Sequence, residues 1–167
     1  MCCTSYYFLQ AVYEDAEAEK SVEWGLDRID QRNLPLDNAA YDHPTGGEGV
    51  AAFILDTGIR VSHQEFTPSG RAYTSSSWDY IGDGQNGNDC DGHGTHVGGT
   101  VAGNTVGVAP GAHLVGVRVL SCSGSGSTAG IIQALDDVAA ACPQGSVSSG
   151  NLPASYQGKK CLANMSL

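Results

Sequence analysis

A wholly apolar run at residues 50–55 constrains the fold of this chain more than any other feature of its sequence. The run reads Val-Ala-Ala-Phe-Ile-Leu and lies between Gly49 and Asp56. A short, continuous apolar run with such borders is typical of a strand buried on both faces of a parallel sheet. A second run, rich in β-branched residues, occupies residues 113–120 and indicates another buried strand.

Helical patterns alternate with these two runs. Residues 95–103 are small with apolar interruptions, which favours a helix packed tightly against a sheet. A later helix is indicated by apolar residues at helical spacing, namely Ile131, Ile132, Leu135, Val138 and Ala139. Alternating strands and helices predict right-handed βαβ units. We therefore expect one α/β domain, a three-layer parallel sheet with helices on both faces, with a further strand beginning at residue 162.

The net charge limits the kinds of binding partner that the protein can have, and the cysteine content indicates its cellular compartment. The 167 residues carry a formal net charge of −10, which disfavours nucleic acid and anionic membranes as partners. No apolar run approaches the roughly 20 residues of a membrane span. Six cysteines without a CxxC pattern favour an oxidising compartment, yet residues 1–9 do not form a signal peptide. A chain that lacks its true N-terminus would reconcile these two indications.

Two titratable residues stand where catalytic chemistry would need them. Asp56 follows the first apolar run directly, and the carboxyl ends of strands are where α/β sheets form sites. His93 lies 37 residues later in the glycine-rich stretch 88–103. An aspartate and a histidine make two thirds of a Ser-His-Asp triad, in which histidine takes the serine proton and the carboxylate fixes its tautomer. The alternative is that Asp56 only caps a turn.

Two other enzyme classes fit the same residues less well. Asp56-Thr57-Gly58 is also the motif of aspartic proteases, but that mechanism needs two such motifs or a homodimer, and only one is present. His93 and His96 would make a zinc pair only with a third ligand, and the HExxH glutamate is missing. We expect His96 instead to pack and hydrogen-bond inside the helix.

Oxygen ligands of the kind that calcium prefers gather in two stretches. The first set is Asp27, Asp30, Gln31 and Asp37. An ordinary polar surface turn explains that set equally well from spacing alone. A weaker second set, without regular loop spacing, is Asp83, Asp89 and Asp91.

Taken together, these motifs identify a family. Asp56-Thr57-Gly58 after an apolar strand, followed by His93-Gly94-Thr95-His96-Val97, resembles the subtilisin-like serine proteases, the subtilases of peptidase family S8. The details are similar to the proteinase K branch, especially its bacterial secreted members. Residues 24–32 resemble the start of the mature enzyme, and residues 117–127 resemble the strand and loop that line the substrate cleft. The resemblance covers residues 22–141 and then 162–167.

The resemblance implies a serine endopeptidase that acts on extended polypeptide. Asp56 and His93 would be the triad acid and base. The substrate would pair as an added β-strand with the backbone of Ser123, Gly124, Ser125 and Gly126. Leu120 and Ile131 would floor the cleft, and Ser166 would border the S1 pocket. The resemblance also implies an extracellular enzyme, which we expect to be a monomer.

Two structural features are implied in the same way. Asp27, Asp30, Gln31 and Asp37 match a calcium site of this branch, although Ala39 stands where relatives offer a further oxygen. Cys90 and Cys122 match a disulfide that would tie the histidine loop to the cleft loop and close 32 residues. Such a bridge typically contributes about 2–4 kcal/mol.

Several departures from the family bear on activity. The sequence has neither the nucleophile motif Gly-Thr-Ser-Met-Ala nor the oxyanion-hole motif Ala-Ala-Gly-Asn, and Asn164 does not match the latter. Residues 142–161 look like an irregular insertion, and residues 1–21 resemble a propeptide tail or a disordered leader. We therefore expect residues 22–167 to be a partial, truncated catalytic domain without activity by itself. The alternative is a non-catalytic fragment or degenerate homologue that at most binds peptides.

Overall fold

The computed structural model describes residues 23–67, 70–148 and 151–167. The expected leader at residues 1–21 lies outside the described residues. The chain forms two compact units, residues 1–44 and residues 45–167. In the described part of the first unit, α2 (Trp24–Asp30) is a short helix that buries Leu26 and Asp27.

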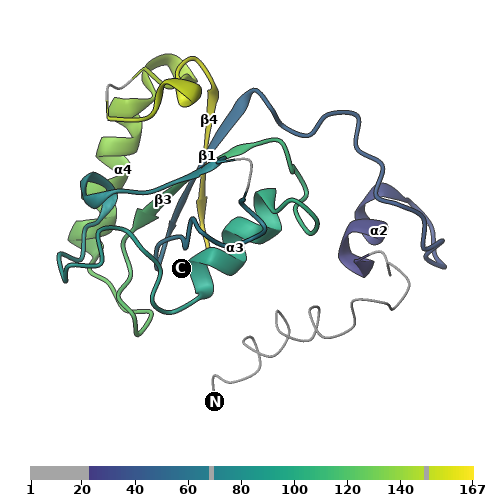
Figure 1. The fold of residues 1–167 in the computed structure, drawn as a ribbon, viewed down its shortest axis with the longest axis horizontal. Coiled ribbons are helices and arrows are strands. Elements are labelled where there is room, and N and C mark those ends of the chain that lie inside the picture. The colour runs from purple at the N-terminus through teal and green to yellow at the C-terminus, as the bar shows by residue number, and fades with distance from the viewer. Residues whose placement is uncertain (1–22, 68–69, 149–150) are drawn as a thin grey trace. The chain divides into compact units, whose positions relative to one another are not determined.

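The second unit is built on a parallel sheet (Figure 1). Its strands are β1 (Val50–Asp56), β2 (Ala72–Tyr73), β3 (His113–Arg118) and β4 (Lys160–Met165), in the order β2-β3-β1-β4. Strand β1 lies between β3 and β4 and is buried from Ala51 to Asp56, as its unbroken apolar run predicts. The expected parallel sheet is therefore confirmed.

Alternate residues of β1 face different helices, because side chains alternate across a strand. Phe53 and Leu55 belong to a core cluster with Ala134 and Val138 of α4 (Thr128–Ala141). The intervening residues Ala52 and Ile54 belong to a second cluster, with Ala102 of α3 (His93–Ala102). The two helices thus cover opposite faces of the sheet, which confirms the expected three layers. None of the helices in the described ranges is long and apolar enough to cross a membrane.

Short 3-10 turns connect the remaining elements. The first, η1 (Ser76–Trp78), contributes the buried Trp78 to the α4 side of the sheet. Two more, η2 (Pro143–Gly145) and η3 (Ala154–Tyr156), lie in the segment between α4 and β4.

That segment, residues 142–161, is the irregular insertion that the sequence suggests, and its described part packs on the core. Val147, Leu152 and Tyr156 join the cluster on the α4 side, and the Tyr156 hydroxyl donates to the Leu114 carbonyl oxygen. A disulfide between Cys142 and Cys161, a pairing that the sequence leaves open, closes the segment. Strand β4 begins at Lys160, two residues before the expected start, and forms an exposed edge of the sheet.

Candidate active site

The site begins at the carboxyl end of β1. Asp56 is the last residue of that strand, and its side chain is 0% exposed. Its Oδ1 accepts a hydrogen bond from the Thr57 amide at 2.7 Å. One such bond does not offset the cost of burying a carboxylate, so Asp56 needs a further polar partner.

His93 is that partner. It is the first residue of α3, and its Nδ1 lies 2.8 Å from Oδ1 and 3.0 Å from Oδ2 of Asp56. The side chain of His93 is 48% exposed, so the ring joins a buried carboxylate to solvent. When Nδ1–H donates to the carboxylate, Nε2 is left as the acceptor. This is the tautomer in which an imidazole can take a proton from a hydroxyl.

A glycine allows the helix to approach the strand end this closely. A Cβ at Gly94 would lie 2.2 Å from the Gly58 carbonyl oxygen and 3.1 Å from the Asp56 Cβ, so any side chain there would push α3 away. The buried face of α3 is made by Gly94, Thr95, Gly98 and other small residues, which leaves His96 exposed. The expectation that His96 packs inside the helix is therefore wrong.

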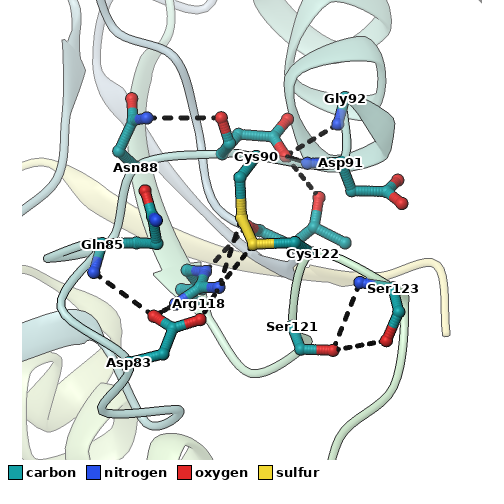
Figure 2. Close-up of a disulfide and its surroundings, with 12 residues drawn as sticks. Asp83, Gln85, Asn88, Cys90, Asp91, Gly92, Arg118, Ser121, Cys122 and Ser123 are labelled. Atoms are coloured by element: carbon teal, nitrogen blue, oxygen red, sulfur yellow. Dashed lines mark hydrogen bonds and ion pairs between the residues drawn. A yellow bond between two sulfur atoms is a disulfide. The ribbon is translucent and has the colours of Figure 1, made fainter.

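A disulfide joins the loop before His93 to the loop after β3 (Figure 2). Cys90 and Cys122 are bonded as the resemblance implies, and both are exposed. Arg118, the last residue of β3, is fully buried and contacts both sulfur atoms, at 3.4 Å from Cys90 and 3.6 Å from Cys122. Hydrogen bonding to Asp83 raises the pKa of Arg118 and outweighs the effect of burial. This arginine is absent from the residues predicted from the sequence, where its one signal is a charge at the end of an apolar strand.

The predicted substrate loop is a tight, exposed turn. Ser121 N donates to the Ser125 carbonyl oxygen, and Gly124 N donates to that of Ser121. Figure 2 shows Ser121 and Ser123 side by side, with their hydroxyls 3.0 Å apart. Residues 123–126 are all exposed, which leaves their outer surface open to a partner.

The other predicted cleft residues follow β3 and β4 or lie in the first turn of α4. Leu120 and Ile131 are half-buried and pack against the α4-side core. Ser166 is exposed and directly follows β4, whose Met165 pairs with Leu55 of β1. Because β3, β1 and β4 are parallel neighbours, the loop after β3, Asp56 and Ser166 lie at one edge.

Comparison with known proteins decides the family. Residues 47–166 match the model of the subtilase family, Peptidase S8. The chain belongs to the subtilases. It is 53% identical over 129 residues to the alkaline serine exoprotease A of Vibrio alginolyticus, covering 77% of this chain and 23% of that protein. It is 55% identical over 113 residues to the extracellular serine proteinase of a Thermus species, covering 68% of this chain and 26% of that protein.

Solved structures agree with this assignment. The fold is similar to a cold-adapted subtilisin-like serine proteinase with a TM-score of 0.71 and 45% identity, over 88% of this chain and 46% of that one. It is also similar to sphericase, with a TM-score of 0.60 and 30% identity, over 90% of this chain and 45% of that one. This subtilase chain thus spans a quarter or so of the two curated relatives and under half of the two solved chains.

The first calcium set lies partly in α2, which carries Asp27 and Asp30, and partly in the loop that follows it, which carries Gln31 and Asp37. Asp27 is 1% exposed, and its Oδ2 accepts from the Asn38 amide at 3.0 Å. Gln31 donates to the carbonyl oxygens of Asn33 and Pro35. Asp30 and Asp37 accept from the backbone amides of Asp42 and Ala39. These side chains therefore close the loop by bonding to its backbone. Within the described ranges, no three His, Cys, Asp or Glu side chains gather into a group that could hold a metal.

The second calcium set serves other purposes, so that prediction is wrong. Asp83 pairs with Arg118 at 2.6 Å, and this hydrogen bond lowers the pKa of Asp83. Asp91 is exposed and accepts from the His93 amide. Asp89 is buried and bonds to two threonines, Thr57 and Thr95. The three carboxylates face three different partners because each balances a local donor, not a shared ion.

Proposed function

We propose that this subtilase chain supplies the acid and base of a serine endopeptidase, with Asp56 as the triad acid and His93 as the general base. The observation that carries the proposal is the buried carboxylate held at 2.8 and 3.0 Å from the imidazole Nδ1. In this role Nε2 takes the proton of a serine hydroxyl and later returns it to the leaving amine. Asp56 stabilises the imidazolium that forms between these steps.

The serine and the oxyanion donor belong to motifs that this sequence does not contain. The chain by itself is therefore expected to be inactive, because loss of a subtilase nucleophile costs on the order of 10⁶ in kcat. A fluorophosphonate probe and a casein assay on the purified chain test this. Labelling that disappears in His93→Ala would contradict the proposal that the chain lacks its nucleophile.

The substrate in this proposal is an extended polypeptide. It would add as a strand along the exposed backbone of residues 123–126, because open backbone donors and acceptors bind extended peptides. Leu120 and Ile131 would floor the cleft, and Ser166 would border the S1 pocket. The position of Leu120 after β3 and of Ser166 after β4, at the carboxyl edge of the sheet, supports this assignment.

An extracellular setting and a structural calcium ion complete the proposal. Two disulfides and a relative named as extracellular support export to an oxidising compartment. Calcium is supported by one orphaned atom, because Oδ1 of Asp27 is buried without a hydrogen-bond partner among the described residues. A hard cation there would satisfy it, with Asp30, Gln31 and Asp37 as further oxygen donors. Residues 22–167 would then form a partial catalytic domain, with 142–161 as its insertion.

A chimera tests the acid–base roles directly. Residues 47–166 would replace the matching segment of the Vibrio alginolyticus exoprotease, which supplies the rest of the domain. We expect a chimera that cleaves casein. His93→Ala should then lower kcat by about 10⁶ and Asp56→Ala by about 10⁴, as found for the corresponding subtilisin residues.

His96→Ala is the matched control, since His96 is exposed on the same helix one turn away. It should leave kcat nearly unchanged. An active chimera that tolerates His93→Ala would refute the catalytic role. A folded, inactive chimera that still binds extended peptides would favour the alternative function, a peptide-binding module without catalysis.

A further inference from the structure

Asp89 is a buried carboxylate that no step of the proposed reaction uses. Asp89 as a whole is 8% exposed. Oδ1 accepts from the Thr57 hydroxyl at 2.8 Å and from the amides of Asp91 and Gly92 at 3.0 and 2.8 Å. Oδ2 accepts from the amide and hydroxyl of Thr95 at 2.9 and 2.5 Å. Five donors therefore converge on one side chain.

These donors come from both sides of the Asp56–His93 pair. Thr57 directly follows Asp56, and its amide also donates to the Asp56 carboxylate. Gly92 directly precedes His93 as the N-cap of α3, and Thr95 follows it in the first turn of that helix. The Thr57 hydroxyl links Asp89 to α3 as well, because it also accepts a hydrogen bond from the Gly94 amide at 2.9 Å. Asp89 and Thr57 thus tie the end of β1 to the start of α3.

The chemistry of this cluster requires an ionised carboxylate. Burial raises the pKa of Asp89, but the hydrogen bonds from Thr95, Gly92 and Thr57 outweigh it and leave the pKa below its ordinary value. Gly92 and Thr95 carry amides at the helix start, where backbone donors lack partners within the helix and negative charge is favoured. An asparagine could not replace the carboxylate, since its NH₂ group would face hydrogen-bond donors.

We propose that Asp89 is a positioning residue, which holds His93 in line with Asp56 through Thr57 and the first turn of α3. This rests on the proposed function, in which the Asp56–His93 pair does the chemistry. The hydrogen bonds of Asp89 go to Thr57, Asp91, Gly92 and Thr95 and not to the side chains of the pair, so Asp89 fixes the two backbone segments that carry them. Its replacement should loosen the pair without removing either member.

The experiment measures the pair directly in the folded chain by NMR. The imidazole Nδ1–H proton of His93, assigned by its loss in His93→Ala, reports the hydrogen bond to Asp56 through its exchange with water. Asp89→Asn should speed this exchange about tenfold or more, since bonds to a charged acceptor are among the strong ones. Asp136→Asn, an exposed carboxylate on α4, removes the same charge and should leave the exchange unchanged.

Two threonine variants keep the test decisive if Asp89→Asn does not fold. Thr57→Ser keeps the hydroxyl that joins Asp89 to Gly94 and should retain slow exchange. Thr57→Val removes the hydroxyl and should speed exchange, with the far-UV circular dichroism unchanged. Slow exchange in a folded Asp89→Asn, or in Thr57→Val, overturns the positioning role alone. A wild-type chain without a protected Nδ1–H proton overturns the positioning role and the proposed function together.

Discussion

Two buried aspartates, one in each unit of the chain, solve the same physical problem differently. Asp89 is surrounded by five donors, so its charge is balanced by the protein itself. Asp27 has a single amide on Oδ2, and its Oδ1 is buried without a hydrogen-bond partner in the described residues. A buried carboxylate with an unpaired oxygen is costly unless something else pairs with it. The contrast separates a carboxylate that organises a site from one that is suited to a cation.

The largest expected effect on stability comes from removing the Asp89 carboxylate and its five hydrogen bonds. Asp89→Ala would leave two threonine hydroxyls and three amides without the acceptor that this buried side chain supplies. We expect the free energy of unfolding to fall by about 3 kcal/mol or more. Denaturant unfolding of the purified chain measures this change.

Asp136→Ala is the control for that measurement, because Asp136 is exposed and should change stability by less than about 0.5 kcal/mol. A similar small change in Asp89→Ala would mean that the five hydrogen bonds contribute little. The claim that Asp89, unlike Asp27, is stabilised by the protein's own donors would then be wrong.

Calcium should stabilise the surroundings of Asp27 without acting through Asp89. If α2 and the loop after it bind calcium, a free calcium concentration of 100 times the Kd stabilises this folded segment by about 2.7 kcal/mol. Backbone amides of α2, such as Leu26 N, which donates to Glu23 O, should then exchange about 100-fold more slowly. Hydrogen exchange with and without calcium measures this, and Asp27→Asn should abolish the response.

Asp89→Asn serves as the matched control for calcium, since it removes a buried carboxylate from the other unit. Its α2 amides should respond to calcium as the wild type does. Unchanged exchange in the wild-type chain at millimolar calcium would contradict a calcium site at Asp27.

Features of this fold that depend on patterns local in sequence could be predicted, and features that depend on contacts between distant residues could not. The apolar run at residues 50–55 and the helical spacing of residues 131–139 are local patterns, and they predict the sheet and its two helical layers correctly. Asp56 and His93 could be paired because a motif links them. Asp89 could not be placed, because an aspartate in a glycine-rich loop looks the same whether it binds an ion, solvent or threonines.

The same limit explains the other errors. His96 lies in a helix whose packed face could not be known before the helix was docked, and the small residues Gly94 and Gly98 occupy that face instead. Residues 142–161 carry few periodic signals, yet Tyr156 and the Cys142–Cys161 bridge fix them to the core through contacts distant in sequence. Such partners become visible only in three dimensions.

The smallest expected effect is a difference in acid stability. Because the pKa of Asp89 is lower in the folded chain than its ordinary 3.8, the folded state binds this proton more weakly than the unfolded state. The stabilisation is therefore complete above the unfolded pKa and is lost as pH falls through the folded one. Each unit of difference between the two pKa values corresponds to about 1.4 kcal/mol.

Unfolding measured from pH 6 down to pH 2 should thus show a steeper loss in the wild type than in Asp89→Asn. Asp79 and Asp83 also have lowered pKa values, through backbone hydrogen bonds and through Arg118 respectively, but they titrate in both proteins. The difference between the two curves therefore isolates Asp89. Parallel curves would mean that Asp89 has the same proton affinity folded and unfolded, and that its five donors do not favour the charged form.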